Sequence, residues 1–191
     1  MRSLGAKPLA QPAPVWVIGT YFEDDRPNMM TAAWGGICCS DPPCVQVSLR
    51  KATATYHNIM RNKAFTVNVP STEFMEKSDY VGMVSGKDAD KFKVTGLTPQ
   101  KSDLVDAPYV AEFPLVLECS LIKPVEIGLH TLFIGEIKDV KVQEQFVDGS
   151  HADMAKIKPI IFAPGSRRYY TVGDQIGQAF SSGRACMRNG E

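Results

Sequence analysis

Residues 28–62, NMMTAAWGGICCSDPPCVQVSLRKATATYHNIMRN, decide the fold of this chain. Within them, residues 44–50 alternate as a half-buried strand does, with three apolar side chains on one face and three polar ones on the other. The apolar set is Val45, Val47 and Leu49, and the polar set is Gln46, Ser48 and Arg50. A helix is predicted directly afterwards, over residues 53–63, because Thr53 and Thr55 can cap it and apolar residues recur along one side. The stretch therefore predicts a strand that leads through a polar corner into a helix.

The polar corner favours an anion. A helix N-terminus offers free backbone N–H groups and a partial positive charge. Hydroxyl and cationic side chains surround this one, and together they are the donors that a phosphate needs. They are Ser48, Arg50, Lys51, Thr53 and Thr55. Taken singly, such residues are ordinary helix caps and solvated charges, so the cluster indicates a phosphate or carboxylate site and names no ligand.

The length of the chain predicts one domain, and its charge and apolar runs argue against a nucleic-acid-binding, membrane or secreted protein. At 191 residues the chain fits one domain with a sizeable core. Its 21 basic and 21 acidic residues balance, so neither nucleic acid nor an acidic membrane surface is an expected partner. No apolar run is long enough to span a bilayer, and residues 1–14 lack the apolar core of a signal peptide. We therefore expect a cytoplasmic protein.

The five cysteines carry no recognisable motif. Their number is odd and no Cys-x-x-Cys spacing occurs, so the sequence predicts neither a zinc site nor a dithiol redox motif. Cysteine is among the most buried residue types. We therefore expect most of the five to be reduced and buried, and we expect no metal ligand.

The remaining segments predict a β-rich fold with inserted helices. Strands are expected over residues 15–22, 29–39, 44–50 and 64–69, with tight turns at 23–28 and 41–43. Gly35 and Gly36 interrupt the second strand, which indicates a bulge or a close approach by a backbone or a flat ligand. Helices are expected from residue 70 to about 86 and over 88–94. Further strands are expected over 113–122, 132–142 and 160–162, with 123–128 as a connection. An antiparallel meander interrupted by helices predicts a barrel with helical flaps.

Several of these motifs together resemble the flavin reductase-like, FMN-binding split-barrel family. They are PNMMTAAWGG, the Pro42-Pro43 turn, VSLRKATATYHNI, AFTVNV, DAPYVAEFPLVLEC and GLHTLFIGEI. The resemblance covers about residues 15–180. It implies a mainly β, Greek-key-like antiparallel split β-barrel in one domain over residues 1–191, with residues 181–191 as a flexible tail. It also implies non-covalently bound FMN and a homodimer with the flavin near the subunit interface.

The resemblance implies cofactor-binding residues in five segments. Asn28, Met29, Met30 and Thr31 correspond to a strand that lines the isoalloxazine ring. Val47, Ser48, Leu49 and Arg50 correspond to the strand beside the ring and the ribityl chain. Thr53, Ala54, Thr55 and Tyr56 correspond to the helix start that takes the phosphate, with Arg50 and Lys51 as charge partners. Ser85, Gly86 and Lys87 correspond to a further flavin-contacting turn, and His130 lines the site from either subunit. No residue is assigned a catalytic role.

Three functions are compatible with these features. The first is an electron-transfer flavoprotein in which FMN carries electrons between redox partner proteins. The second is an NAD(P)H:flavin oxidoreductase. No Gly-x-Gly-x-x-Gly fingerprint is present, but split-barrel reductases bind nicotinamide without it. The third is a barrel without a redox role, which the complete set of hydroxyls and cations at the corner disfavours.

Overall fold

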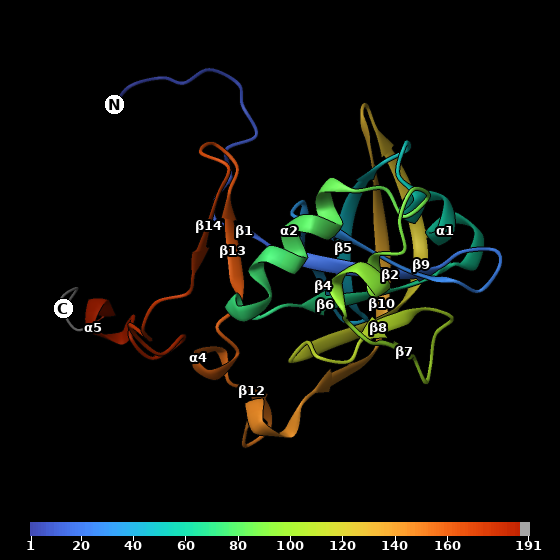
Figure 1. Cartoon of the computed structure of the whole chain (residues 1–191). Coiled ribbons are helices and arrows are strands. Elements are labelled where there is room, and N and C mark those ends of the chain that lie inside the picture. Colours follow the sequence, from blue (N-terminus) through green and yellow to red (C-terminus); the bar gives the residue numbers. More distant parts are fainter. Residues whose placement is uncertain (188–191) are drawn as a thin grey trace.

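The molecule is organised around one curled antiparallel sheet. The computed structural model describes residues 1–187. Seven strands follow one another in the order β3-β2-β6-β9-β10-β5-β4 (Figure 1). Their bounds are β3 Pro27–Ala32, β2 Trp16–Tyr21, β6 Ala64–Val69, β9 Leu115–Ile127, β10 His130–Val142, β5 Pro43–Arg50 and β4 Gly35–Ser40. Within residues 1–187, no hydrogen-bonded pairing joins β3 to β4, so the barrel is split between them. The predicted fold, mainly β with inserted helices, is confirmed.

The core of the barrel follows the period-two pattern of the strands. Val45, Val47 and Leu49 on β5 point inwards together with Phe65 and Phe133, whereas Arg50 is exposed. The alternation read from residues 44–50 is therefore confirmed. Because the core fixes which face of β5 is inside, it also fixes where the polar corner lies.

The inserted helices gather beside β3 and β2. They are α1 Ala54–Asn62, the 3-10 turn η1 Thr72–Phe74, α2 Met75–Met83 and α3 Lys91–Thr95. Three of these helix ends have a local cause: Thr53 caps the start of α1, Asp90 caps the start of α3, and Gly96 ends α3 with a φ of 65°. The α-helices α1, α2 and α3 occur where the sequence predicts them, within a few residues.

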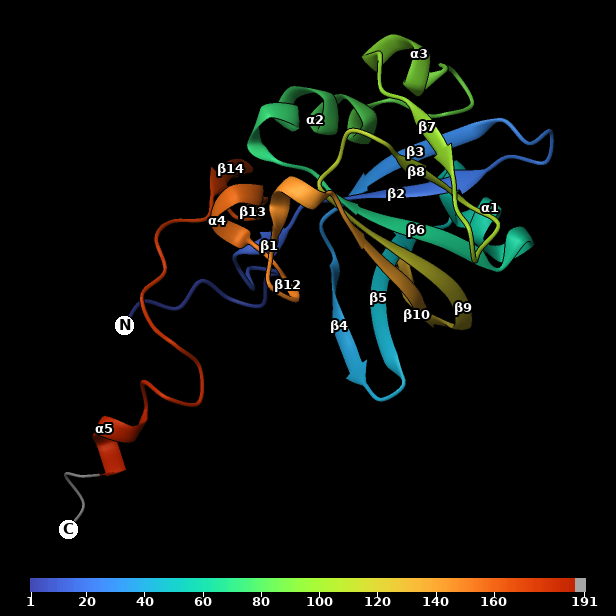
Figure 2. The same ribbon diagram turned by 90° about the horizontal axis from the view of Figure 1, so that it is seen from below.

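Smaller elements lie outside the barrel. β1 Ala13–Pro14, β13 Ile160–Ala163 and β14 Arg168–Thr171 form a separate sheet, and β7 Pro99–Lys101 pairs with β8 Pro108–Val110. The remaining short elements are η2 Glu144–Phe146, β11 Val147–Asp148, β12 His151–Ala152, α4 Met154–Ile157 and α5 Arg184–Met187. Residues 172–187 run away from the barrel (Figure 2). The end of the predicted tail, 188–191, lies outside the described residues.

None of the helices within residues 1–187 combines the length and the apolar character that crossing a membrane requires.

The predicted strand over residues 29–39 is wrong, because the chain forms two strands there. β3 pairs with β2 and β4 pairs with β5, so the two lie at opposite ends of the sheet. The chain changes partner at residues 33–34. A side chain on Gly35 would overlap the Trp16 ring, so the glycine serves a close approach by an indole. The sequence indicated a close approach, but could not show which group it admits.

The predicted connection over residues 123–128 is also wrong. β9 continues as a strand to Ile127, and the hairpin turn is confined to residues 128–129. β10 is thirteen residues long, and its pairing with β9 runs from His130–Ile127 to Val142–Leu115, with two register shifts. The long partner strand therefore imposes strand structure on a segment whose local sequence reads as a turn.

The expectation that most of the five cysteines are buried is wrong. Cys44 and Cys119 are buried, whereas Cys38, Cys39 and Cys186 are exposed, and all five are free thiols. Cys38 and Cys39 are exposed because β4 is an edge strand that projects with β5 beyond the rest of the barrel (Figure 2).

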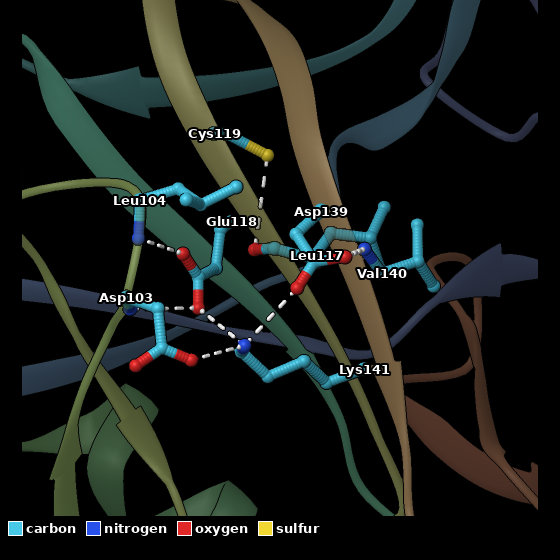
Figure 3. A network of polar contacts seen from close by, with 8 residues as sticks. All are labelled: Asp103, Leu104, Leu117, Glu118, Cys119, Asp139, Val140 and Lys141. Atoms are coloured by element: carbon cyan, nitrogen blue, oxygen red, sulfur yellow. Dashed lines mark hydrogen bonds and ion pairs between the residues drawn. The ribbon is translucent and has the colours of Figure 1, made fainter.

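A buried carboxylate ties the β9–β10 hairpin to the loop between β7 and β8 (Figure 3). Glu118 is 0% exposed and accepts hydrogen bonds from the backbone N–H groups of Asp103 (3.2 Å) and Leu104 (2.8 Å). The Lys141 ammonium lies 3.3 Å from the Glu118 carboxylate, 2.6 Å from Asp103 and 3.0 Å from Asp139. Hydrogen bonds to these carboxylates, first to Asp103 and Asp139, raise the pKa of Lys141. The buried Glu118 carboxylate is thus held by two backbone N–H groups and by one ammonium, which it shares with Asp103 and Asp139.

Candidate functional site

A pocket of about 270 Å³ lies where the N-terminus of α1, the end of α2 and β3 meet. Thirteen residues line it: Asn28, Met30, Arg50, Ala52, Thr53, Ala54, Thr55, Gly82, Met83, Val84, Ser85, Gly86 and Lys91. Eight of them were predicted as cofactor-binding residues. At Gly82 and Met83 the pocket continues into a second one of about 220 Å³, which Thr31, Phe162 and Tyr169 help to line. The two together form an elongated site over β3.

Free hydrogen-bond donors converge at the α1 end of the pocket. Within the described chain, neither the Ala54 nor the Thr55 backbone N–H has a partner, as expected for the first turn of a helix. The two threonine hydroxyls differ. Thr53 Oγ1 donates to Arg50 O (2.9 Å) and accepts from Tyr56 N–H (3.3 Å), so it serves as the cap. Thr55 Oγ1 accepts from Asn28 Nδ2 (3.1 Å), which leaves its own proton free to be donated into the pocket.

The two cations of the corner also differ. Lys51 forms an ion pair with Glu126 (2.8 Å), and this hydrogen bond raises the pKa of Lys51. Arg50 lines the pocket and forms no ion pair within residues 1–187. The positive charge that is available to an anion at this helix end is therefore that of Arg50.

A buried acceptor also belongs to the lining of the pocket. The Nδ2 group of Asn28 is held by Thr20 (3.3 Å) and Thr55 (3.1 Å), but its Oδ1 atom is buried and has no hydrogen-bond partner in the described residues. A side chain on Gly86 would collide with this oxygen, so only glycine fits there. An unpartnered buried carbonyl is costly, and a ligand N–H or O–H group in the pocket would satisfy it.

Lys91 is the one charged residue among the five lining residues that the sequence did not reveal. Its side chain is 4% exposed, and Nζ donates to the carbonyls of Met29 (2.9 Å) and Val81 (2.7 Å). No carboxylate pairs with it within residues 1–187, and burial lowers its pKa to about 8. Lys91 and Lys93 flank Phe92 on a short polar helix, a pattern typical of solvated lysines, so no local signal could have found the buried one. The pocket thus holds a second cation, from the side of α3.

Lys91 makes the stability of the ligand-free protein depend on pH. The folded protein releases the Lys91 proton near pH 8, whereas the unfolded chain keeps it up to about 10.5. Between these values the unfolded state binds more protons, so stability must rise with pH. We expect a contribution on the order of 3 kcal/mol across this window, lost in Lys91→Met. Urea unfolding at several pH values from 7 to 10.5 measures it.

Lys93→Met is the matched control, because Lys93 is exposed on the same helix. Tyrosines and cysteines titrate in the same window, so the informative quantity is the difference in slope between each variant and the wild type. A Lys91→Met protein whose stability follows the wild-type pH profile would contradict a buried ammonium.

The other predicted site residues lie around the pocket. The Met29, Val47 and Leu49 side chains are in the core, so only their backbones can reach a ligand. Tyr56 packs edge-on against Phe133, and Thr31 donates to Ser78 O. Ser48 lines a separate surface groove, Lys87 borders a groove next to the pocket, and His130 opens β10 opposite Arg50. Their roles as cofactor ligands stay predictions.

Known proteins share this architecture and much of this sequence. The flavoredoxin of Desulfovibrio vulgaris (Miyazaki F) is 52% identical and superposes with a TM-score of 0.92, over 96% of this chain and 99% of that one. The flavoredoxin from Methanosarcina acetivorans is 28% identical with a TM-score of 0.91, over 98% of this chain and 100% of that one. A high molecular weight rubredoxin of Moorella thermoacetica is 31% identical over 141 residues, which are 73% of this chain and 60% of that protein.

The family assignment rests on nearly the whole barrel. The sequence model described as the flavin reductase like domain matches residues 10–171, which include every strand of the seven-stranded sheet and the helices around the pocket. This chain belongs to the flavin reductase-like domain family.

Proposed function

We propose that this chain is an FMN-binding electron-transfer flavoprotein of the flavoredoxin type, which passes electrons between redox partner proteins. The observation that carries the proposal is the pocket at the start of α1, where two free backbone N–H groups, the Thr55 hydroxyl and the Arg50 guanidinium converge. The 52% identity to a flavoredoxin over almost the full length supports it.

The residues present fit FMN part by part. The phosphate takes the donors at the α1 end, because a helix N-terminus and a guanidinium both favour a dianion. The buried Asn28 Oδ1 accepts from a hydroxyl or N–H group of the cofactor. Met30 and Thr31, which line the two adjoining pockets, would hold the flat ring. Bound FMN supplies the electron transfer, and the protein positions and tunes it. The buried Lys91 ammonium favours negative charge nearby and so opposes a low flavin potential.

A visible absorption spectrum followed by anaerobic NADH addition tests this function. We expect flavin bands that co-elute with the protein in gel filtration and that persist after NADH, because the electron donor of a carrier is another protein. Chemical reduction with dithionite serves as the positive control for a reducible flavin. Rapid bleaching by NADH would contradict the carrier and identify a reductase, and a colourless protein that FMN cannot reconstitute would contradict both.

A second candidate function, NAD(P)H:flavin oxidoreductase, is favoured by a groove beside the pocket. This groove of about 580 Å³ shares Ala54 with the pocket and runs along the α1 face of His57, Asn58 and Arg61. Arg26 and Lys87 complete its basic lining, beside Glu23 and Asp24. Basic side chains next to a flavin site suit the phosphates of a nicotinamide dinucleotide. NADH oxidation that increases in proportion to added free flavin would establish this activity.

We further propose a homodimer with the flavin near the subunit interface. The aromatic residues Tyr169 and Tyr170 lie on β14, which pairs with β13 of the same chain. The exposed apolar groups lie further along: Ile176 and Phe180 are 101% and 100% exposed on the extended segment 172–187. Large apolar side chains in that state gain free energy by packing on another surface.

Removal of the segment after Thr171 is therefore expected to weaken dimerisation. Burying two such side chains in each of two copies contributes about 6 kcal/mol, so the truncated protein should be a monomer at micromolar concentration. Light scattering measures the mass. The matched control is the full chain with Gln175→Ala and Gln178→Ala, which alters polar residues of the same segment. A full-length monomer would contradict the dimer, and a dimeric truncation would place the interface elsewhere.

A further inference from the structure

The hairpin between β4 and β5 brings two cysteines opposite each other. Its turn is formed by Asp41 and Pro42, Ser40 pairs with Pro43, and Cys39 pairs with Cys44. Directly opposed residues of antiparallel strands have Cα atoms about 4.5–5.5 Å apart and side chains on the same face. Disulfides form between Cα atoms roughly 4.4–6.8 Å apart. The strand pairing shifts register between Ile37 and Cys39, and Cys39 is the residue that has Cys44 as its partner. The pairing therefore brings these two cysteines side by side at the end of the hairpin.

The two thiols differ in access. Cys39 is exposed on the edge strand, and its Sγ donates only to the Asp41 carbonyl (3.3 Å). Cys44 is buried, and burial raises its pKa, with smaller contributions from the nearby Cys39 and Cys38 thiols. The exposed thiol is therefore the one that a reagent in solution meets first, and the buried thiol lies behind it.

Other pairings are disfavoured by geometry or access. Cys38 and Cys39 are adjacent in sequence, and a bond between neighbours is strained. Cys119 lies within the barrel core at 0% exposure, where burial raises its pKa to about 12, so it supplies little thiolate. Cys186 lies on the extended C-terminal segment, outside this hairpin.

We propose that Cys39 and Cys44 form a reversible dithiol–disulfide site that exchanges with small-molecule disulfides. The Cys39 thiolate attacks one sulfur of a disulfide such as oxidised glutathione, forms a mixed disulfide and expels one glutathione thiolate. The Cys44 thiolate then attacks the Cys39 sulfur, forms the Cys39–Cys44 bond and expels the second thiolate. Two protein thiols are oxidised, one disulfide is reduced to two thiols, and the two protons pass to the leaving thiolates. The Cys39–Cys44 disulfide covalently links β4 to β5 at the tip of the edge hairpin.

This site is separate from the FMN site. Cys44 lies at one end of β5 and Arg50 at the other, six residues away, which is about 20 Å along a strand. The exchange is therefore independent of flavin binding, and its success or failure leaves the proposed function untouched.

Acid cleavage tests the pairing directly, because the bond between Asp41 and Pro42 lies between the two cysteines and is the one Asp–Pro bond in the sequence. The full-length protein is treated with oxidised glutathione or with dithiothreitol, its free thiols are alkylated, and the Asp–Pro bond is hydrolysed in dilute acid. We expect fragments 1–41 and 42–191 to stay joined after oxidation and to separate after reduction. The count of free thiols should fall from five to three.

Single variants identify the partners. Cys39→Ser and Cys44→Ser should each release the fragments after oxidation, whereas Cys38→Ser, the matched control, should leave them joined. Because Cys44 is buried, Cys44→Ala is tested alongside Cys44→Ser, and circular dichroism shows whether each variant is folded. If neither is folded, the exposed Cys39→Ser variant alone tests the pairing. Any one of four results would overturn the proposal. They are separation of the oxidised wild-type fragments, fragments that stay joined in Cys39→Ser or Cys44→Ser, fragments that separate in Cys38→Ser, and a band at twice the chain mass.

Discussion

Replacement of Arg50 and Thr55 by alanine together is expected to abolish FMN retention while the barrel stays folded. The variant removes the guanidinium that has no ion pair within residues 1–187 and the hydroxyl whose proton is free. Hydrogen bonds to a charged group contribute about 1.5–3 kcal/mol each, so the loss is about 3–6 kcal/mol. That corresponds to a dissociation constant at least about a hundred times higher.

The fold should survive because neither side chain supports the core. Arg50 is exposed, and Asn28 keeps its hydrogen bond to Thr20 when Thr55 is lost. Quenching of FMN fluorescence on titration with apoprotein measures affinity, and circular dichroism reports the fold. The matched control is Lys51→Ala with Thr53→Ser, two neighbours of the same corner. Glu126 already neutralises Lys51, and serine preserves the cap. Equal FMN occupancy in the double alanine variant and the wild type would place the phosphate elsewhere.

Replacement of Glu118 by alanine is expected to lower the free energy of unfolding more than the other substitutions do. The carboxylate is fully buried, holds the backbone N–H groups of Asp103 and Leu104, and balances part of the Lys141 charge (Figure 3). Its removal leaves two partly buried N–H groups without their acceptor and creates a cavity. Loss of one partner of a buried ion pair costs about 3–5 kcal/mol. Urea unfolding at saturating FMN, which removes differences in cofactor occupancy, measures the free energy of unfolding.

Glu126→Ala is the control for this prediction, since Glu126 lies on the same strand, β9. Its ion pair with Lys51 is solvent-exposed, and such pairs contribute about 0–1 kcal/mol. In Glu118→Ala, residues 102–106 should also unfold locally before the rest of the protein. Faster hydrogen exchange of the Asp103 and Leu104 amides measures this local unfolding. Similar unfolding free energies for the two variants would show that the buried network contributes nothing beyond an exposed pair.

Sequence alone predicted the features that have local causes. The alternation of Val45, Val47 and Leu49 set the buried face of β5, and the Asp41-Pro42-Pro43 turn set the hairpin before it. Thr53 marked the start of α1, because a cap acts within a few residues. The corner that gathers donors for an anion could be read in the same way, since strand, cap and cations are consecutive.

Tertiary structure alone decided which of those donors are available. The Thr53 hydroxyl caps α1, and Lys51 forms an ion pair with Glu126, which is 75 residues away along the chain. Thr55 and Arg50 therefore remain available to bind a ligand. Lys91 reaches the pocket only because the Met29 and Val81 carbonyls come together from β3 and α2. The same holds for residues 29–39, which divide between two partner strands at opposite ends of the sheet. Hydrogen bonds and ion pairs between distant segments form only once the chain has folded, and local sequence carries no record of them.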